Sequence, residues 1–488
     1  MQKNNYDVIV VGAGASGLYA ALHLDTKLKV LLLSKRELSL SNSSLAQGGI
    51  AAVYDKKHDT VEEHIHDTLV AGGFANDKNH VDILTNEGPN DVIDLMEKYN
   101  VDFDRNPDGT PNLTLEGGHN KPRILHYKDC SGKEIVDKLI IAVKKYKNIT
   151  ILENHICCDL QKTNDTFHLD VIDQQSNHTT YNSHFVIMCT GGIGRVYEYT
   201  TNSAIATGDG ITLAYRLGAT IKNLHLVQFH PTAFANKHTR ESFLISESVR
   251  GEGAVLKNCN HERFMHNYDQ RLELAPRDVV SRSIMKEAHK TQSSEFYLDI
   301  THKDAKFITN RFPMIYASLM VEGYDLTKDL IPIFPCQHYL MGGIDVDDNS
   351  KTTIDGLYAC GECSHTGVHG NNRLASNSLL EAVVFSRRCA TQINELIKTK
   401  TDDFDLYNFK EETNTNLIPH GIRTEIRAIM QDAYFVAPDA NGIKRGFKRV
   451  EELLNLIETS NLKIDRDYVE ARSLATVAYI ILKEVKAD

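Results

Sequence analysis

The first 34 residues alternate between apolar runs and a short glycine-rich segment. The run "YDVIVV" (6–11) has the length of a strand, "GAGASG" (12–17) is typical of a tight turn, and "LYAALHL" (18–24) has the apolar content of a buried helix. A second apolar run, "KVLLLS" (29–34), follows at the distance of a βαβ unit. This order predicts an α/β fold that begins with a Rossmann-like parallel sheet.

The remaining pattern divides the chain into three parts. After a loop-rich stretch from about 42 to 123, the pattern predicts a helix over 133–146 and strands over 149–154 and 184–190. Short strands and helices mix from about 222 to 340, and strand and turn signals of the first part return at 355–362, before a helix over 376–397. The charged tail has helical periodicity. We expect a discontinuous nucleotide-binding domain (1–222 and 341–398), an inserted α+β capping domain (223–340) and a C-terminal helical domain (399–488).

Composition agrees with several domains and narrows the range of partners. The 488 residues are 41% hydrophobic and 24% charged, as in a soluble globular protein, and the formal net charge is −11. That charge argues against nucleic acid as a partner. No apolar run has membrane length, the start has no signal-peptide pattern, and the nine cysteines form no dense disulfide framework. We therefore expect a cytoplasmic protein with no membrane partner.

The glycines of "GAGASG" carry the first functional signal. Gly12, Gly14 and Gly17 form G-x-G-x-x-G directly after a strand, and this spacing lets a backbone turn and a helix N-terminus approach a pyrophosphate. The acid that usually follows the second strand, where it holds the adenosine ribose, is replaced by Ser34 and Lys35. We expect Lys35 or backbone groups to serve instead.

Three further segments favour a flavin over a nicotinamide. "IMCTGG" (187–192) ends a strand in small residues, and a second strand ends at Glu362, which could bind ribose or ribityl hydroxyls. "ASNSLLEA" (375–382) starts a helix at Ser or Asn, an N-cap signal. A helix N-terminus aimed at the flavin pyrimidine would stabilise the reduced ring.

Another group of residues suits a dicarboxylate. Arginine grips a carboxylate through two parallel hydrogen bonds, and histidine adds a donor of adjustable charge. Such residues stand beside glycine, proline or small polar residues, as loop-borne site residues often do. They are His230, Ser246, Glu247, Arg250, Arg277, His338 and Arg373.

Metal and thiol chemistry are not expected. "CGEC" (360–363) has C-x-x-C spacing but overlaps the proposed flavin strand and lacks a second such pair. The pair Cys157–Cys158 and "HTGVHG" (365–370) also lack metal-binding partners along the sequence. We therefore assign no metal ligands.

Over roughly residues 5–395 the chain resembles the L-aspartate oxidases, a family of the succinate dehydrogenase and fumarate reductase flavoprotein superfamily. The resemblance rests on long segments in unbroken order, among them "VVGAGASGL", "AQGGIAAV", "EGGHNKPRILH", "QFHPTA", "ELAPRDVVSR", "HYLMGGI" and "GVHGNNRLASNSLLEA". It implies a Rossmann-like FAD domain, a mobile capping domain and a C-terminal helical domain. The implied reaction is oxidation of L-aspartate to iminoaspartate, with hydride passing to flavin N5, reoxidation by O2 or fumarate, and a hand-off to quinolinate synthase in NAD biosynthesis.

The resemblance also implies residue roles. His230, Ser246, His338 and Arg373 would bind the substrate carboxylates, and Arg277 would transfer a proton with Glu247 and Arg250 as its relay. Asn42 occupies the position at which the dehydrogenases usually carry a flavin-linked histidine, so FAD should be noncovalent. The expected FAD contacts are Gly12, Ala13, Gly14, Ala15, Ser16, Gly17, Lys35, Asn42, Ser43, Ser44, Leu45, Ala46, Gln47, Gly48, Gly49, Asp209, Glu362, Ser378 and Leu379.

Glu116 is the unexpected carboxylate in a basic loop, "TLEGGHNKPRILH" (114–126). An ammonium group is what distinguishes aspartate from succinate, so we interpret Glu116 as the residue that recognises the amine, with Gly117 and Gly118 allowing close approach. A salt bridge to Lys121 or Arg123 is the alternative. At the level of the whole chain, the alternatives are a succinate dehydrogenase or fumarate reductase flavoprotein, and a flavin redox sensor that uses Cys360 and Cys363.

Overall fold

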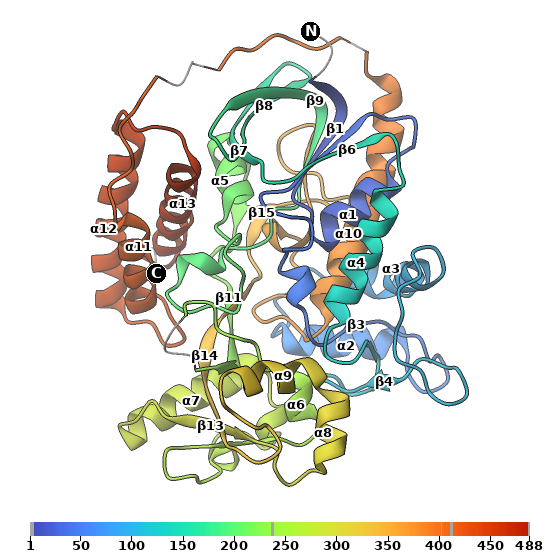
Figure 1. Ribbon diagram of the computed structural model, residues 1–488, viewed down its shortest axis with the longest axis vertical. Coiled ribbons are helices and arrows are strands. Elements are labelled where there is room, and N and C mark those ends of the chain that lie inside the picture. The colour runs from blue at the N-terminus through green and yellow to red at the C-terminus, as the bar shows by residue number, and fades with distance from the viewer. Residues whose placement is uncertain (1–3, 236–238, 402, 410–412, 487–488) are drawn as a thin grey trace.

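A parallel sheet forms the centre of the computed structural model, which describes residues 4–235, 239–401, 403–409 and 413–486 (Figure 1). Strand β1 (Asn5–Val11) lies between β2 (Val30–Leu33) and β9 (His178–Met188), and all three run parallel. The sheet continues in parallel to β6 (Ile149–Leu152) at one side and to β16 (Leu357–Ala359) at the other. The Rossmann-like α/β prediction is confirmed.

Alternate residues of the central strands pack into two different cores. Val8 and Val10 belong to the core on one face, whereas Ile9 and Val11 belong to the core on the other. This alternation is what a strand buried on both faces requires. The first face is covered by three helices, α1 (Ala15–His23), α4 (Ser131–Val143) and α10 (Asn377–Leu396).

The other face is covered by α5 (Asp209–Arg216) and by the C-terminal helices. These are α11 (Ile422–Ala433), α12 (Ala440–Thr459) and α13 (Arg466–Lys486), which lie together at one side of the molecule (Figure 1). Helix α13 packs on α5 and so connects the tail to the nucleotide-binding sheet. Within the ranges that the structure covers, every helix is too short or too polar to cross a membrane.

The stretch from 42 to 123 is more helical than the sequence pattern predicts. It contains α2 (Val61–Ala71), whose N-terminus is capped by Thr60, and the 20-residue α3 (Lys78–Glu97), capped by Asp77. Glycine and proline in the middle of α3 hide its helical pattern. Gly88 is needed there for packing, because a Cβ at this position would lie 2.7 Å from the Leu380 side chain of α10.

An antiparallel sheet with its own core forms the part drawn at the bottom of Figure 1. Its strand order is β11 (Val227–Phe234), β14 (Ile331–Leu340), β13 (Phe296–Asp299) and β12 (Val255–Lys257). Helices α6, α7, α8 and α9 surround it and share its hydrophobic core; they are Glu247–Gly251, Arg277–Thr291, Ala305–Arg311 and Pro313–Val321. The proposed capping domain, 223–340, contains this whole sheet.

Two smaller arrangements place site residues. Strands β3 (Ile50–Ala51), β5 (Ile124–Leu125) and β4 (Leu113–Thr114) form a small antiparallel sheet, so the 115–123 loop lies beside the glycines that precede β3. Beyond the parallel strands, β8 (Thr166–Ile172) pairs antiparallel with the first half of β9, and β7 (Ile156–Thr163) pairs antiparallel with β8.

Candidate active site

A cavity of about 650 Å³ lies between the parallel sheet and the capping sheet. Its size is that of a cofactor and substrate site. Most of the sequence-predicted residues line it, from both sheets: Gly12, Ala13, Gly14, Ser16, Lys35, Asn42 to Gly49, Glu116, Asp209, His230, Ser246, Glu247, Arg277, His338, Glu362, Arg373, Ser378 and Leu379. Three of the predicted residues, Ala15, Gly17 and Arg250, are not among the residues that line the cavity.

The turn after β1 has the conformation that close approach to a pyrophosphate requires. Gly12 has φ +111°, and a Cβ there would lie 2.1 Å from the carbonyl oxygen of Cys189. Ala15, the first residue of α1, donates its backbone N–H to Oγ of Ser43 at 3.2 Å. Backbone and hydroxyl donors thus converge where the helix dipole favours an anion.

Lys35, which follows β2 where the acid is missing, pairs with two acidic groups from later elements. Nζ of Lys35 lies 2.9 Å from Oδ2 of Asp209 in α5 and 3.2 Å from Oε1 of Glu470 in α13. The lysine also donates to Thr207 at 2.7 Å. Glu470 has no motif around it, so the sequence gives no reason to associate it with this site. The C-terminal helices therefore help to fix the nucleotide end of the cavity.

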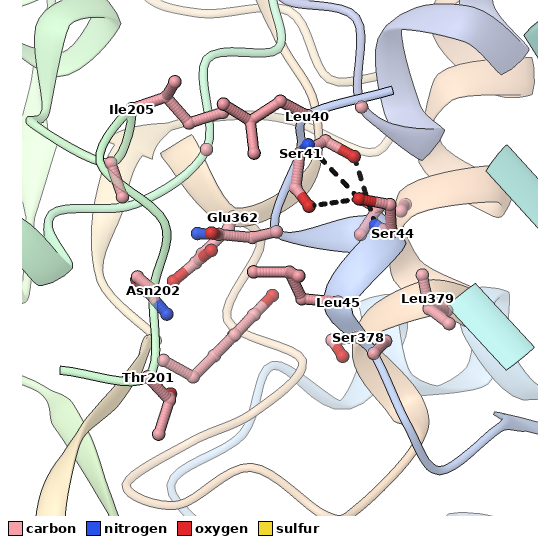
Figure 2. Close-up of a pocket in the computed structure, with 18 of the residues that line it drawn as sticks. Leu40, Ser41, Ser44, Leu45, Thr201, Asn202, Ile205, Glu362, Ser378 and Leu379 are labelled. Carbon is pink, nitrogen blue, oxygen red and sulfur yellow. Dashed lines mark hydrogen bonds between the residues drawn. The ribbon is translucent and has the colours of Figure 1, made fainter. Parts of the chain in front are cut away.

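The loop before β3 is held by hydrogen bonds within itself and to Ser203. Backbone and hydroxyl groups of Ser41 and Ser44 bond to each other, opposite Thr201, Asn202 and Ile205 across the pocket (Figure 2). Oδ1 of Asn42 accepts from the backbone N–H and the hydroxyl of Ser203. The asparagine is thereby fixed at the cavity wall.

Gln47 binds the capping segment directly. Its amide nitrogen donates to the carbonyl of Leu244 at 2.5 Å, and its oxygen accepts the backbone N–H of Ser246 at 3.0 Å. Oγ of Ser246 accepts from Ser248 and caps α6. The position of Ser246 thus depends on the loop that precedes β3.

Glu362 and the start of α10 complete the flavin end of the predicted site. Oε1 of Glu362 accepts the backbone N–H of Leu340 at 3.0 Å, and burial raises the pKa of this carboxyl to about 7. Helix α10 begins at Asn377, as predicted, but Ser376 does not cap it with its side chain. Ser376 adopts φ +61°, and its hydroxyl donates to Glu116 instead.

Two neutral histidines face the substrate end of the cavity. Nδ1 of His230 accepts the backbone N–H of Thr232 at 3.2 Å, so the ring proton of the neutral form sits on Nε2. Nε2 is buried and has no hydrogen-bond partner among the described residues. Nδ1 of His338 bonds to Thr201 at 2.7 Å, and the two rings lie 5.0 Å apart. Burial and the nearby arginines lower the pKa of both rings well below its usual value.

Two buried arginines converge beside these histidines. Arg277 and Arg373 each donate to Oε1 of Gln228 at 3.1 Å. The Arg373 guanidinium lies 4.3 Å from the centre of the Tyr339 ring, and burial lowers its pKa to about 10. Gln228 belongs to the segment "QFHPTA", but nothing in the sequence pattern indicates that it bonds to two arginines.

Arg277 starts a buried chain of charges. Its Nε donates to Oε2 of Glu247 at 2.7 Å, and Arg250 lies 3.0 Å from Oε1 of the same carboxylate. Burial alone would raise the pKa of Glu247, but the two arginines outweigh it and hold the pKa below its usual value. Arg250 donates onward to the carbonyl of Glu273, whose side chain pairs with the half-exposed Arg263.

Glu116 is buried at the same cavity and is not part of a salt bridge in its own loop. It is 4% exposed, and Oγ of Ser376 donates to its Oε2 at 2.5 Å. Burial raises the pKa of Glu116. Lys121 pairs with Glu63, and Arg123 pairs with Asp59 and Asp67, so the salt-bridge alternative is wrong. Gly117 allows the loop to approach, because a Cβ there would lie 2.3 Å from Oε1 of Glu247.

The thiols of "CGEC" point to different sides of the sheet. Cys360 belongs to the core under α1 and α10, whereas Cys363 belongs to the opposite core and its Sγ donates to the carbonyl of Met188 at 3.2 Å. Both thiols are buried. A disulfide between them would require a rearrangement of the strand end.

Comparisons with known proteins agree with this geometry. Residues 7–379 match the FAD binding domain family. The L-aspartate oxidase of Acinetobacter baylyi is 38% identical over 98% of this chain and 91% of its own, and that of Clostridium acetobutylicum is 46% identical over 80% and 88%. The fold matches the FrdA chain of E. coli quinol fumarate reductase with a TM-score of 0.91 and 29% identity, covering 100% of this chain and 90% of that chain. The chain therefore belongs to the L-aspartate oxidase family of FAD-binding flavoproteins and is an FAD-dependent oxidoreductase.

Proposed function

We propose that this chain oxidises L-aspartate to iminoaspartate, using noncovalently bound FAD. The observation that carries the choice of substrate is the buried carboxylate of Glu116, which lines the same cavity as the cationic and neutral donors His230, His338, Arg277 and Arg373. A dicarboxylate that also bears an ammonium group complements both parts of this cavity.

The carboxylates of the substrate are bound by residues from both sheets. Arg373, His230 and His338 all line the cavity. Arg373 offers a planar set of donors, the buried Nε2–H of His230 has no partner among the described residues, and the His338 ring lies beside that of His230. Ser246 lies at the start of α6 and is held in place by Gln47. Because both histidines stay neutral, they orient the substrate through hydrogen bonds, with His230 as a donor, while the arginines supply the charge.

Glu116 binds the ammonium group of L-aspartate. Its neighbour Ser376 orients Oε2, and exclusion of water strengthens the attraction between carboxylate and ammonium. A dicarboxylate without an amine gains nothing from Glu116. This difference in binding would make L-aspartate a better substrate than succinate.

Arg277 transfers the proton that the reaction releases or consumes. Oxidation removes a hydride from Cα and a proton from nitrogen, and fumarate, when it is the acceptor, takes up one hydride and one proton to become succinate. FAD, when bound, supplies the two-electron acceptor at N5. Arg277 lies at the cavity wall with Glu247 and Arg250 behind it, so Glu247 would accept a proton that Arg277 takes from the substrate and Arg250 would stabilise the charge of this carboxylate.

The cofactor would be held by the glycine turn, Lys35, the 42–49 loop, Asp209, Glu362 and the start of α10. Asn42 offers no imidazole for a covalent link, and its side chain is occupied by Ser203. The residues present therefore fit a noncovalently bound dinucleotide.

A fumarate reductase or succinate dehydrogenase flavoprotein is the second candidate, favoured by the close structural match to FrdA. The same match supports fumarate beside O2 as an acceptor for this chain. A redox sensor is disfavoured, because Cys360 and Cys363 lie on opposite faces of the sheet. As the first enzyme of NAD biosynthesis, a cytoplasmic protein of this kind would hand iminoaspartate to a quinolinate synthase.

Product analysis tests this proposal. Purified holoenzyme is incubated with L-aspartate and fumarate without oxygen, and ammonia from iminoaspartate hydrolysis is measured beside succinate. Equal amounts of both products are expected, with peroxide replacing succinate in air. Absence of ammonia would refute the assignment. Acid precipitation tests the cofactor: yellow colour should stay in solution, and a yellow pellet would contradict noncovalent binding.

A further inference from the structure

Cys158, Asp170 and His178 come together on the antiparallel edge of the main sheet. They belong to the adjacent strands β7, β8 and β9. The β7–β8 register shifts between Cys157 and Asp159, so Cys158 sits in an irregularity of the ladder. Such irregularities re-aim a side chain. Here the thiol is directed onto Asp170.

The three ligand atoms have the spacing of one coordination sphere. Sγ of Cys158 lies 3.1 Å from Oδ2 of Asp170, and Nδ1 of His178 lies 2.9 Å from the same oxygen. All three atoms lie within 4.8 Å of one another. Ligands of a tetrahedral zinc ion are roughly 3.3–3.6 Å apart, given metal–ligand bonds of about 2.0–2.3 Å. The two distances to the Asp170 oxygen are a few tenths of an ångström shorter than this, so the side chains would have to move apart to admit an ion.

This cluster is separate from the flavin cavity. Cys157 and Ile156 line that cavity, whereas none of the three cluster residues does. Cys158 packs with Ile156, Ile172 and Val469 of α13. The His178 side chain is 26% exposed, so an ion and a water ligand can reach the cluster from solvent. Of these two adjacent cysteines, Cys157 therefore faces the flavin cavity, and Cys158 belongs to the cluster with Asp170 and His178.

We propose that Cys158, Asp170 and His178 form a zinc site with one water-filled position. One sulfur, one nitrogen and one carboxylate oxygen favour Zn²⁺ over Mg²⁺ or Ca²⁺, which prefer all-oxygen sites. A bound ion would connect three strands at the edge that supports α13 and would stabilise this edge against opening.

Cys158 would bind the ion as a thiolate, so the thiol proton would be released to solvent on binding. Arg472 of α13 donates to the backbone carbonyl of Cys158, so a positive charge lies near the bound thiolate.

Metal titration of the full-length, tag-free holoenzyme tests the site. After chelator treatment, Zn²⁺ uptake is measured by competition with a chromophoric chelator, and Co²⁺ is added to detect thiolate coordination from its absorption. We expect one equivalent of Zn²⁺ and a thiolate band with Co²⁺. Cys158→Ser and His178→Gln should each weaken Zn²⁺ binding by about 100-fold or more, since even outer partners of metal ligands contribute about 10- to 100-fold.

Cys157→Ser is the matched control, because it removes the adjacent thiol and should leave binding unchanged. His178→Gln alters a surface residue and keeps the test valid if Cys158→Ser folds poorly. No stoichiometric uptake by the wild type would overturn the proposal. Uptake that survives both Cys158→Ser and His178→Gln, or that is lost equally in Cys157→Ser, would also overturn it.

Discussion

Arg277 and Arg373 donate to one shared atom, Oε1 of Gln228, each over 3.1 Å. The first arginine comes from α7 and the second from the loop before α10, so a single amide fixes two guanidinium groups from distant parts of the chain. In the proposed reaction, their convergence would define where a substrate carboxylate and the reacting carbons lie.

Gln228→Met removes this acceptor at similar volume. Because small displacements of positioned groups can cost about 100-fold in rate, we expect kcat/KM for L-aspartate to fall by about that factor. Bound FAD should stay constant. Ser281→Ala is the control, since it removes a neighbouring buried hydrogen bond between α7 and β11 and leaves the Gln228 amide and both arginines in place. Equal losses in both variants would assign Gln228 a merely structural role.

Arg277→Lys keeps the positive charge but removes the guanidinium group, which donates to both Glu247 and Gln228. General acid–base groups contribute about 100- to 10,000-fold, so kcat should fall within that range while FAD content is retained. Steady-state kinetics and flavin absorbance check this. Arg282→Lys, an exposed arginine on the same helix, should behave as wild type. Activity within a few-fold of wild type in Arg277→Lys would exclude proton transfer by Arg277.

Glu116→Gln should affect L-aspartate more than dicarboxylates without an amine. Loss of one partner of a buried charge pair costs about 2–5 kcal/mol, so kcat/KM for L-aspartate should fall at least about 30-fold. Fumarate reduction should change little. Burial raises the pKa of Glu116, and so wild-type activity on L-aspartate should decline as falling pH protonates this carboxyl. Equal losses for aspartate, succinate and fumarate would make Glu116 structural.

Glu362 should make the stability of the apoprotein depend on pH. An unfolded glutamate loses its proton near pH 4.5, whereas Glu362 holds it to about pH 7. Between these values the folded state binds more protons, so stability falls as pH rises, by about 3 kcal/mol in total. Thermal melts should show this decline in wild type and a flatter profile in Glu362→Gln. Parallel profiles would contradict the raised pKa.

The sequence could predict the parts whose signal is local. The strand, glycine turn and helix at 6–24 are continuous in the chain, and their period and spacing determine them. The helix at 78–97 was hidden because Gly88 and Pro89 interrupt its pattern, although Gly88 is there to pack against Leu380. A local sequence pattern cannot show that Gly88 is needed for a contact with a residue 292 positions later in the chain.

The site residues also divide into those that a local motif identifies and those that only the fold brings together. Residues inside long motifs, such as Arg277 and His338, could be named from sequence. Glu470 and the partner of Glu116, Ser376, could not be assigned these roles, because the contacts arise when α13 and α10 are placed by the fold. The same applies to His178 beside Cys158.

Anaerobic mixing of purified holoenzyme with L-aspartate or with succinate, followed by flavin absorbance, tests the central claim most directly. Both ligands can use the arginines and histidines of the cavity, and only aspartate can use Glu116. We predict prompt bleaching by L-aspartate and much slower bleaching by succinate. Prompt bleaching by succinate with none by L-aspartate would contradict the account.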